Sequence, residues 1–194
     1  MPGRFPQVQQ VYILRHPCGQ FESWQRRGWK LEPAKLLQNR RLMEDHLHPF
    51  ESLLSRASSF WERAGALWAA VTYVIHRQTE ADKGRFIVAY EWLCDEPVAR
   101  FRELYRRLGL AWSRKAEHFL HISDRPGDTR TYSLVRSSKM QVDVWKGRLR
   151  DDDIAACRGF VEPFELPYYP AFEPRVASMC GDQAYDNAGP VLPP

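Results

Sequence analysis

Two short apolar runs predict strands of a parallel sheet. Residues 11–14 read Val-Tyr-Ile-Leu and residues 86–90 read Phe-Ile-Val-Ala-Tyr, without alternation of polar and apolar positions. Continuous runs of this kind are typical of strands that helices cover on both faces. Arg15-His16-Pro17 ends the first run, because proline has no N–H to donate to a sheet ladder.

Helical periodicity is strongest over residues 53–75, where apolar side chains recur every three or four positions. The members of this set are Leu54, Ala57, Trp61, Ala64, Trp68, Val71 and Ile75. They predict one long amphipathic helix with a broad apolar face. A shorter helix is expected from about Pro17 to Gln25, and Glu32-Pro33 predicts a break followed by a second helical piece.

The second half of the chain predicts two more helices. Asp95 or Glu96 is expected to cap a helix with Pro97 in its first turn, and Gly109 to end that helix. Residues 123–143 are polar and contain Pro-Gly, which predicts a long loop. Asp residues at 151–153 open another helix, where the dipole favours negative charge; a metal site is the weaker interpretation of this cluster.

The order of these elements predicts an α/β fold with a parallel sheet flanked by helices. We expect one domain over residues 1–170. Residues 171–194 are rich in Pro, Gly, Ala and Asp, which predicts a poorly ordered C-terminal tail.

Composition narrows the class of protein. Hydrophobic residues make up 44% of the 194 residues and aromatic residues 13%, so a folded domain is expected. The net charge of +4 suits an anionic ligand but is too small to predict nucleic-acid binding. The cysteines lie apart, without metal-binding spacing, and no signal sequence or membrane span is present. We therefore expect a cytoplasmic protein with no metal and no membrane partner.

The candidate chemistry lies where the first predicted strand ends. Arg15 follows that strand, and Ser23 lies in the helix after it. Ligands of open α/β sheets bind at this end of the strands, and a guanidinium, a hydroxyl and a helix N-terminus together suit a phosphate group. The alternative is a surface arginine and an ordinary helix serine.

These residues resemble the 3′-phosphate-binding motif of the sulfotransferases, an Arg-x-Pro with a serine eight positions after the arginine. Two further blocks are similar to that family. Residues 88–93 read Val-Ala-Tyr-Glu-Trp-Leu, followed by Asp-Glu-Pro and Leu-Gly-Leu, and Ser137-Ser138-Lys139 precedes Trp145. The resemblance implies a P-loop-NTPase-like sulfotransferase fold. It also implies 3′-phosphoadenosine 5′-phosphosulfate as co-substrate and a small-molecule or saccharide acceptor with a hydroxyl or amine.

The resemblance assigns roles to single residues. It implies that Arg15 and Ser23 hold the 3′-phosphate, that Tyr90 approaches the adenine, and that Ser138 and Lys139 belong to a loop that closes over the donor. Tyr90 is equally well explained as a tyrosine of the core. A solvated loop is the simpler explanation of Ser138 and Lys139.

The sequence also departs from the family. His16 stands where an aspartate is usual, and the strand, Lys-containing loop and helix that cradle the 5′-phosphosulfate have no counterpart. We therefore expect an N-terminally incomplete fold that is inactive alone. His46 and His48 are candidate bases, although surface histidines explain them better.

Other functions stay open. A non-catalytic remnant that binds a nucleotide or a partner is the main alternative, and self-association is a further one. An RNA-binding module is a weaker alternative, because no RNA-binding motif is present.

Overall fold

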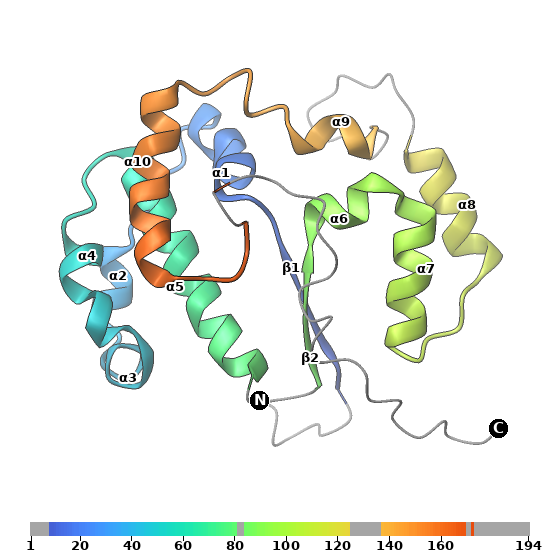
Figure 1. The fold of residues 1–194 in the computed structure, drawn as a ribbon, viewed down its shortest axis with the longest axis horizontal. Helices are drawn as coiled ribbons and strands as arrows, with labels where there is room; N and C mark the ends of the chain where they lie inside the picture. The colour runs from blue at the N-terminus through green and yellow to red at the C-terminus, as the bar shows by residue number, and fades with distance from the viewer. Residues whose placement is uncertain (1–7, 81–83, 125–136, 170–171, 173–194) are drawn as a thin grey trace.

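The computed structural model describes residues 8–80, 84–124, 137–169 and 172. Helices dominate this part of the chain and surround a small parallel sheet (Figure 1). Strand β1 (Gln10–Leu14) pairs with β2 (Arg85–Ala89), with Gln10 opposite Arg85 and Leu14 opposite Ala89. The predicted parallel pairing of these two segments is confirmed.

The remaining elements are mostly short helices. The α-helices are α1 (Pro17–Arg26), α2 (Ala34–Leu37), α3 (Arg40–Leu42), α4 (Glu51–Ser55), α5 (Phe60–Glu80), α6 (Tyr90–Asp95), α7 (Pro97–Arg107), α8 (Arg114–Ser123), α9 (Ser138–Val142) and α10 (Asp151–Val161). A π-helical turn, η2 (Met43–Leu47), and the 3-10 turns η3 (His48–Phe50) and η4 (Glu162–Phe164) complete them.

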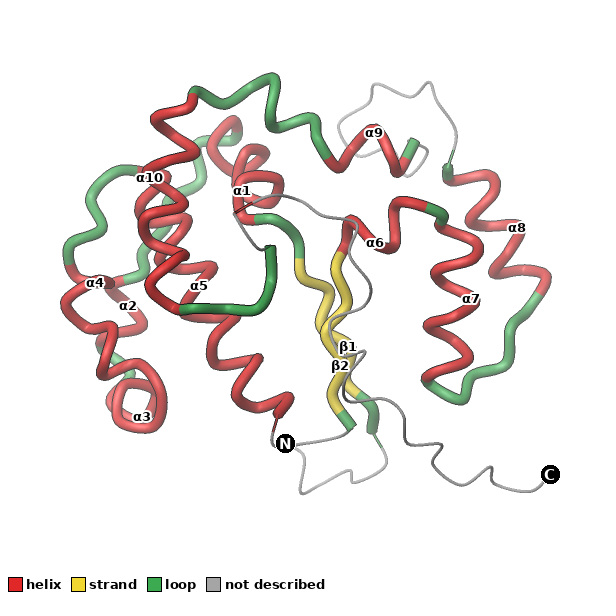
Figure 2. Tube along the Cα trace, in the orientation of Figure 1, coloured by secondary structure: helices red, strands yellow, loops and turns green. Residues whose placement is uncertain are grey.

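Helices lie on both sides of the sheet, with α1, α5 and α10 on one side and α6, α7 and α8 on the other (Figure 2). The strands alternate between two apolar clusters. Tyr12 and Ile87 pack into a large cluster with α5 and α10, whereas Val11 and Val88 pack into a smaller one with α6 and α7. This layering is the coarse α/β arrangement that the sequence predicts.

The two strands differ in burial. Phe86, Ile87 and Val88 of β2 are buried, as predicted for a covered strand. β1 is only partly covered, and Ile13 is 59% exposed. The prediction that β1 is buried on both faces is wrong, because a continuous apolar run does not show which neighbours cover it.

The predicted single helix over residues 53–75 is two helices. Residues 56–59 interrupt it, because Ser58, Ser59 and Glu62 form a helix start there. Glu62 Oε2 accepts from the N–H groups of Ser58 and Ser59, each at 2.8 Å, and Ser59 Oγ accepts from Glu62 N–H at 3.2 Å. The Ser58 hydroxyl, which donates to the same Oε2 at 2.6 Å, and then the two N–H groups lower the pKa of Glu62 to about 2. This reciprocal capping fixes the first residue of α5.

The other predicted boundaries of helices and strands agree with the structure, with two exceptions. Pro97 starts α7 and Gly109, at φ 67°, follows its end, as predicted. The second predicted strand ends one residue early, since Tyr90 begins the short helix α6. The predicted loop over residues 123–143 contains α9, and residues 125–136 of it lie outside the described part. The helix predicted at residues 151–153 is α10.

The predicted tail contributes at least one buried side chain. Phe172 is 7% exposed and packs against His16, with ring centroids 4.6 Å apart. The other residues of the segment 171–194 lie outside the described part.

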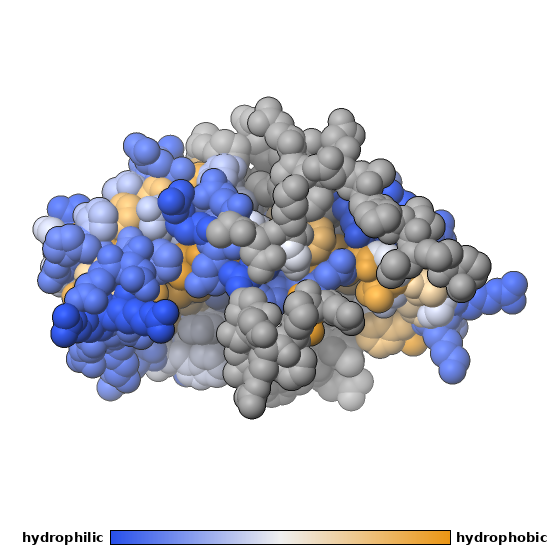
Figure 3. All heavy atoms as spheres, turned by 90° about the horizontal axis from the view of Figure 1, so that it is seen from below, coloured by the Kyte–Doolittle hydropathy of each residue, from blue (hydrophilic) through white to orange (hydrophobic). Residues whose placement is uncertain are grey.

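The surface is mixed in character. Figure 3 shows hydrophilic residues over the end that holds α2–α4, with apolar residues showing through toward the α7 and α8 end. Exposed apolar side chains at that end include Leu110, Phe119 and Ile122. None of the described helices combines the length and hydrophobicity needed to cross a bilayer. Within the same residues, no group of three or more metal-ligating side chains is present.

Candidate functional site

The carboxyl ends of both strands lead directly into the candidate residues. β1 is followed by Arg15, and β2 is followed by Tyr90. Because the strands are parallel, these two residues meet at the same edge of the sheet. The Arg15 guanidinium lies over the Tyr90 ring, with Cζ 4.6 Å from the ring centroid. This cation–π contact joins two segments that are 75 residues apart in the chain.

Within the described part of the chain, Arg15 has N–H donors that make no hydrogen bond. Its Nη2 donates to the Gln141 carbonyl oxygen at 3.1 Å, whereas its Nε is buried and makes no hydrogen bond. No carboxylate among the described residues pairs with Arg15. A guanidinium carries five N–H donors, and a buried donor without a partner costs free energy. The arrangement therefore suits an anionic ligand.

Gly19 makes room for a second unpaired donor. A Cβ at this fully buried position would lie 3.1 Å from Arg15 Nε and 3.2 Å from Trp145 Cδ1. Trp145 Nε1 is also buried without a hydrogen-bond partner. Glycine in the first turn of α1 thus leaves the space of a Cβ for the guanidinium and the indole, which both approach that point. Two N–H donors without a hydrogen-bond partner therefore lie next to this one residue.

Ser23 lies further along α1 than the other candidates. Its hydroxyl donates to the Gln20 carbonyl oxygen of its own helix at 3.4 Å. Among the described residues, no hydrogen bond joins Ser23 to Arg15. The preceding residue, Glu22, is buried and accepts from Arg26 at 2.8 Å and Arg148 at 3.2 Å. The structure therefore places Ser23 on the helix that follows Arg15 and next to a cationic cluster.

α9 brings Ser138 and Lys139 to the same end of the sheet. Gln141 in this helix accepts the Arg15 hydrogen bond, and the Ser138 N–H donates to Asp124 Oδ1 at 2.6 Å. Lys139 is exposed and its Nζ lies 3.4 Å from Asp95 Oδ1. Surface ion pairs of this kind contribute little stability. Lys139 thus lies near the site with its charge directed to Asp95.

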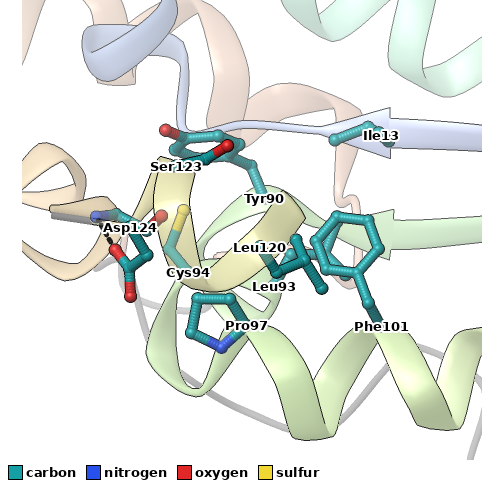
Figure 4. A pocket seen from close by; sticks show the side chains of 10 residues that line it. Ile13, Tyr90, Leu93, Cys94, Pro97, Phe101, Leu120, Ser123 and Asp124 are labelled. Carbon is teal, nitrogen blue, oxygen red and sulfur yellow. Dashed lines mark hydrogen bonds between the residues drawn. The ribbon is translucent and has the colours of Figure 1, made fainter. Parts of the chain in front are cut away.

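A pocket of about 220 Å³ opens beside Tyr90 (Figure 4). Its lining residues come from β1 and from α6 to α9: Ile13, Tyr90, Leu93, Cys94, Pro97, Phe101, Leu120, Ser123, Asp124 and Ser138. Burial raises the pKa of the Tyr90 hydroxyl, and it raises the pKa of the Cys94 thiol to about 11. Both groups are therefore neutral at physiological pH, and the apolar lining suits an uncharged ring.

His16 is a polar residue whose burial the sequence did not predict. Its ring is fully buried and stacks on Trp145, with centroids 4.5 Å apart. Burial lowers the pKa of His16 to about 4, so the ring is neutral. Nε2 lies 3.1 Å from the Phe172 carbonyl oxygen, which can only accept, and therefore Nε2 carries the proton. His16 replaces the expected aspartate with an uncharged side chain.

Two further residues bond the backbone beside Arg15, with Trp68 donating to the Arg15 carbonyl and Glu91 accepting from the His16 N–H. The Tyr169 hydroxyl donates to Glu91 and lies 3.1 Å from the Leu14 carbonyl oxygen. The sequence carries one signal for Glu91, because a charged residue directly follows the apolar run over residues 86–90. In the sequence, Trp68 does not differ from the other apolar core positions of α5. Tyr169 is separated from Leu14 by 155 residues, so local pattern could not reveal their contact.

Comparison with models of known protein families, with curated proteins and with solved structures finds no match to this chain.

Proposed function

We propose that the end of β1 binds the 3′-phosphate of 3′-phosphoadenosine 5′-phosphosulfate and that the protein acts in sulfuryl transfer. The acceptor would be a hydroxyl or amine whose oxygen or nitrogen attacks sulfur. The S–O bond to the nucleotide breaks in this step, 3′-phosphoadenosine 5′-phosphate leaves, and the proton of the acceptor passes to solvent water. The topology of the sulfotransferase family is part of this proposal.

One observation carries the proposal most directly. Arg15 lies at the carboxyl end of a parallel strand with a buried, unpaired Nε, and the unpaired Trp145 Nε1 also lies next to Gly19. Strand ends of this type are where α/β sheets bind ligands, and a guanidinium with unused donors favours phosphate.

The neighbouring pocket supports an adenine nucleotide over inorganic phosphate. Tyr90 contacts Arg15 through its ring face and also lines the pocket. The pocket lining is largely apolar and its titratable hydroxyl and thiol are neutral, which favours an uncharged heterocycle. One residue would therefore contact both the base and the arginine that holds the phosphate.

The central test is calorimetry with 3′-phosphoadenosine 5′-phosphate. We expect Arg15→Ala to weaken binding by about 1.5–3 kcal/mol, the usual contribution of a hydrogen-bonded charge, or roughly tenfold to a hundredfold. Arg40→Ala is the matched control, because Arg40 is exposed and pairs only with nearby Glu44 among the described residues. Unchanged affinity in folded Arg15→Ala protein would remove the proposal.

A second measurement tests which phosphate is bound. Adenosine 5′-phosphosulfate lacks the 3′-phosphate, so it would leave Arg15 without its partner and bind far more weakly than the 3′-phosphorylated donor. Equal affinities in a competition titration would contradict the assignment.

The main alternative is a protein that binds the nucleotide without turnover. The observation that favours it is His16, which is buried and neutral and bonds Phe172, and is thus withdrawn from acid–base chemistry. Transfer of labelled sulfate to phenols, alcohols and saccharides decides between the two. Nucleotide binding without any transfer would select the alternative.

A further inference from the structure

The turn between β1 and α1 is held by side chains from three other parts of the chain. β1 ends at Leu14 and α1 begins at Pro17, so the backbone between them belongs to neither element. Three successive residues there have remote partners. The Leu14 carbonyl lies 3.1 Å from Tyr169 Oη, the Arg15 carbonyl accepts from Trp68 Nε1 at 2.8 Å, and the His16 N–H donates to Glu91 Oε1 at 3.0 Å.

Glu91 connects these contacts into one network. Its side chain is fully buried, and its second oxygen, Oε2, accepts from Tyr169 Oη at 2.6 Å. The rings of Trp68 and Tyr169 lie 5.9 Å apart. A buried carboxylate is costly unless hydrogen bonds satisfy it, and fully satisfied polar networks hold a single geometry. The backbone on both sides of Arg15 is therefore fixed in one conformation.

We propose that Trp68, Glu91 and Tyr169, here called the clamp residues, are positioning residues that aim the Arg15 guanidinium at the 3′-phosphate. This inference rests on the proposed function of the same site. Binding groups must be held within about 0.5 Å of their working position, and a long side chain carries any backbone rotation out to its charged end. Loosening the turn would misplace the guanidinium while leaving the apolar pocket unchanged.

The distinguishing readout is a ratio of two affinities. Adenosine 5′-phosphate has no 3′-phosphate, so its affinity reports the contacts to the base, the ribose and the 5′-phosphate. The ratio between 3′-phosphoadenosine 5′-phosphate and adenosine 5′-phosphate then isolates the Arg15 contact. A merely structural role for the clamp would leave this ratio unchanged, because it would move both affinities together or neither.

Tyr169→Phe is the first variant, since it removes one hydroxyl and keeps the ring. We expect roughly a tenfold fall in affinity for the 3′-phosphorylated nucleotide and no change for adenosine 5′-phosphate. Tyr168→Phe is the matched control. It removes the neighbouring hydroxyl, which lies 2.9 Å from His76 Nδ1 and away from the turn, and it should keep the wild-type ratio.

A double-variant cycle completes the test. If the hydroxyl acts through Arg15, adding Tyr169→Phe to Arg15→Ala should cause no further fall in the ratio. Glu91→Gln, which keeps the shape of the side chain, should lower the ratio in the same way and replaces Tyr169→Phe if that variant does not fold.

The possible results distinguish a failure of the clamp from a failure of the proposed function. A folded Tyr169→Phe or Glu91→Gln protein that keeps the wild-type ratio overturns the clamp, as does an equal loss of both affinities. A wild-type protein without any preference for the 3′-phosphorylated nucleotide overturns the proposed function and the clamp together.

Discussion

Arg15 and His16 are adjacent in sequence but lie in different surroundings. Arg15 lies at the edge of the sheet with a buried Nε that makes no hydrogen bond, whereas His16 points into a cage of aromatic rings. His16 Nδ1 has no hydrogen-bond partner, and its Nε2–H is used by Phe172. The charged groups that act on the ring are Arg15, Lys146 and Asp143, and burial outweighs all of them in lowering its pKa.

The buried His16 predicts acid sensitivity. Its pKa is about 4 in the folded protein and 6.5 in an exposed chain, so only the unfolded state gains the proton as pH falls below 6.5. The contribution of His16 to the free energy of unfolding is therefore fully present above pH 6.5. It falls by about 3 kcal/mol as the pH drops from 6.5 to about 4.

Urea unfolding across that pH range should show a steeper loss for wild type than for His16→Gln, which cannot titrate. The comparison removes the contribution of the acidic residues, since both proteins contain them. Parallel pH profiles would show that burial does not suppress protonation of His16.

Helices α5 and α10 pack closely against each other at Gly65. Gly65 of α5 faces Cys157 and Phe160 of α10, and a Cβ at Gly65 would overlap the Cys157 carbonyl oxygen. Backbone atoms cannot move aside as a flexible side chain can. The two helices therefore depend on glycine at this position for their separation.

Gly65→Ala should destabilise the protein by about 1–3 kcal/mol, because the two helices must move apart. Gly159→Ala on α10 is the matched control, since a Cβ there meets nothing within 4 Å. At that position alanine should raise stability by up to about 1 kcal/mol through helix propensity. Melting temperatures that shift equally in both variants would contradict this packing.

Element boundaries show where local pattern is sufficient. Pro97 and Gly109 bound α7 as predicted, because proline and glycine act through their own backbone preferences. The periodicity over residues 53–75 hid the break before α5, since Ala57 continues the apolar spacing across it. Ser59 and Glu62 carried the signal of that break as a serine followed three residues later by a glutamate.

At the scale of the whole molecule, the described residues form two apolar clusters of unequal size on the two sides of the sheet. The larger cluster joins α1, α5 and α10, and the smaller has only Val88, Trp92, Leu93 and Leu104 as its buried members among the described residues. The free energy of a local opening is larger where more apolar contacts must break. The side that carries the pocket is therefore the less stable one.

Hydrogen exchange should reveal this difference. We expect backbone amides of α5 and α10 to exchange only through global unfolding, whereas those of α7 and α8 exchange through a local opening of lower free energy. Saturating 3′-phosphoadenosine 5′-phosphate should slow exchange in α7 and α8, because a ligand in the pocket stabilises the closed form. Equal protection of the amides in all four helices would contradict this difference in stability between the two sides of the sheet.

The sequence by itself determined the two strands of a parallel sheet, the helices α1 and α7 and the place of Arg15 at a strand end. These features depend on local periodicity and on the backbone chemistry of proline and glycine. Only the tertiary structure decided the partial exposure of β1, the stacking of Arg15 on Tyr90, the burial of His16 and the bonds from Trp68, Glu91 and Tyr169. Each of those depends on residues far apart in the chain, and neither the direction of a side chain nor the neighbour that covers it can be read from the residues on either side.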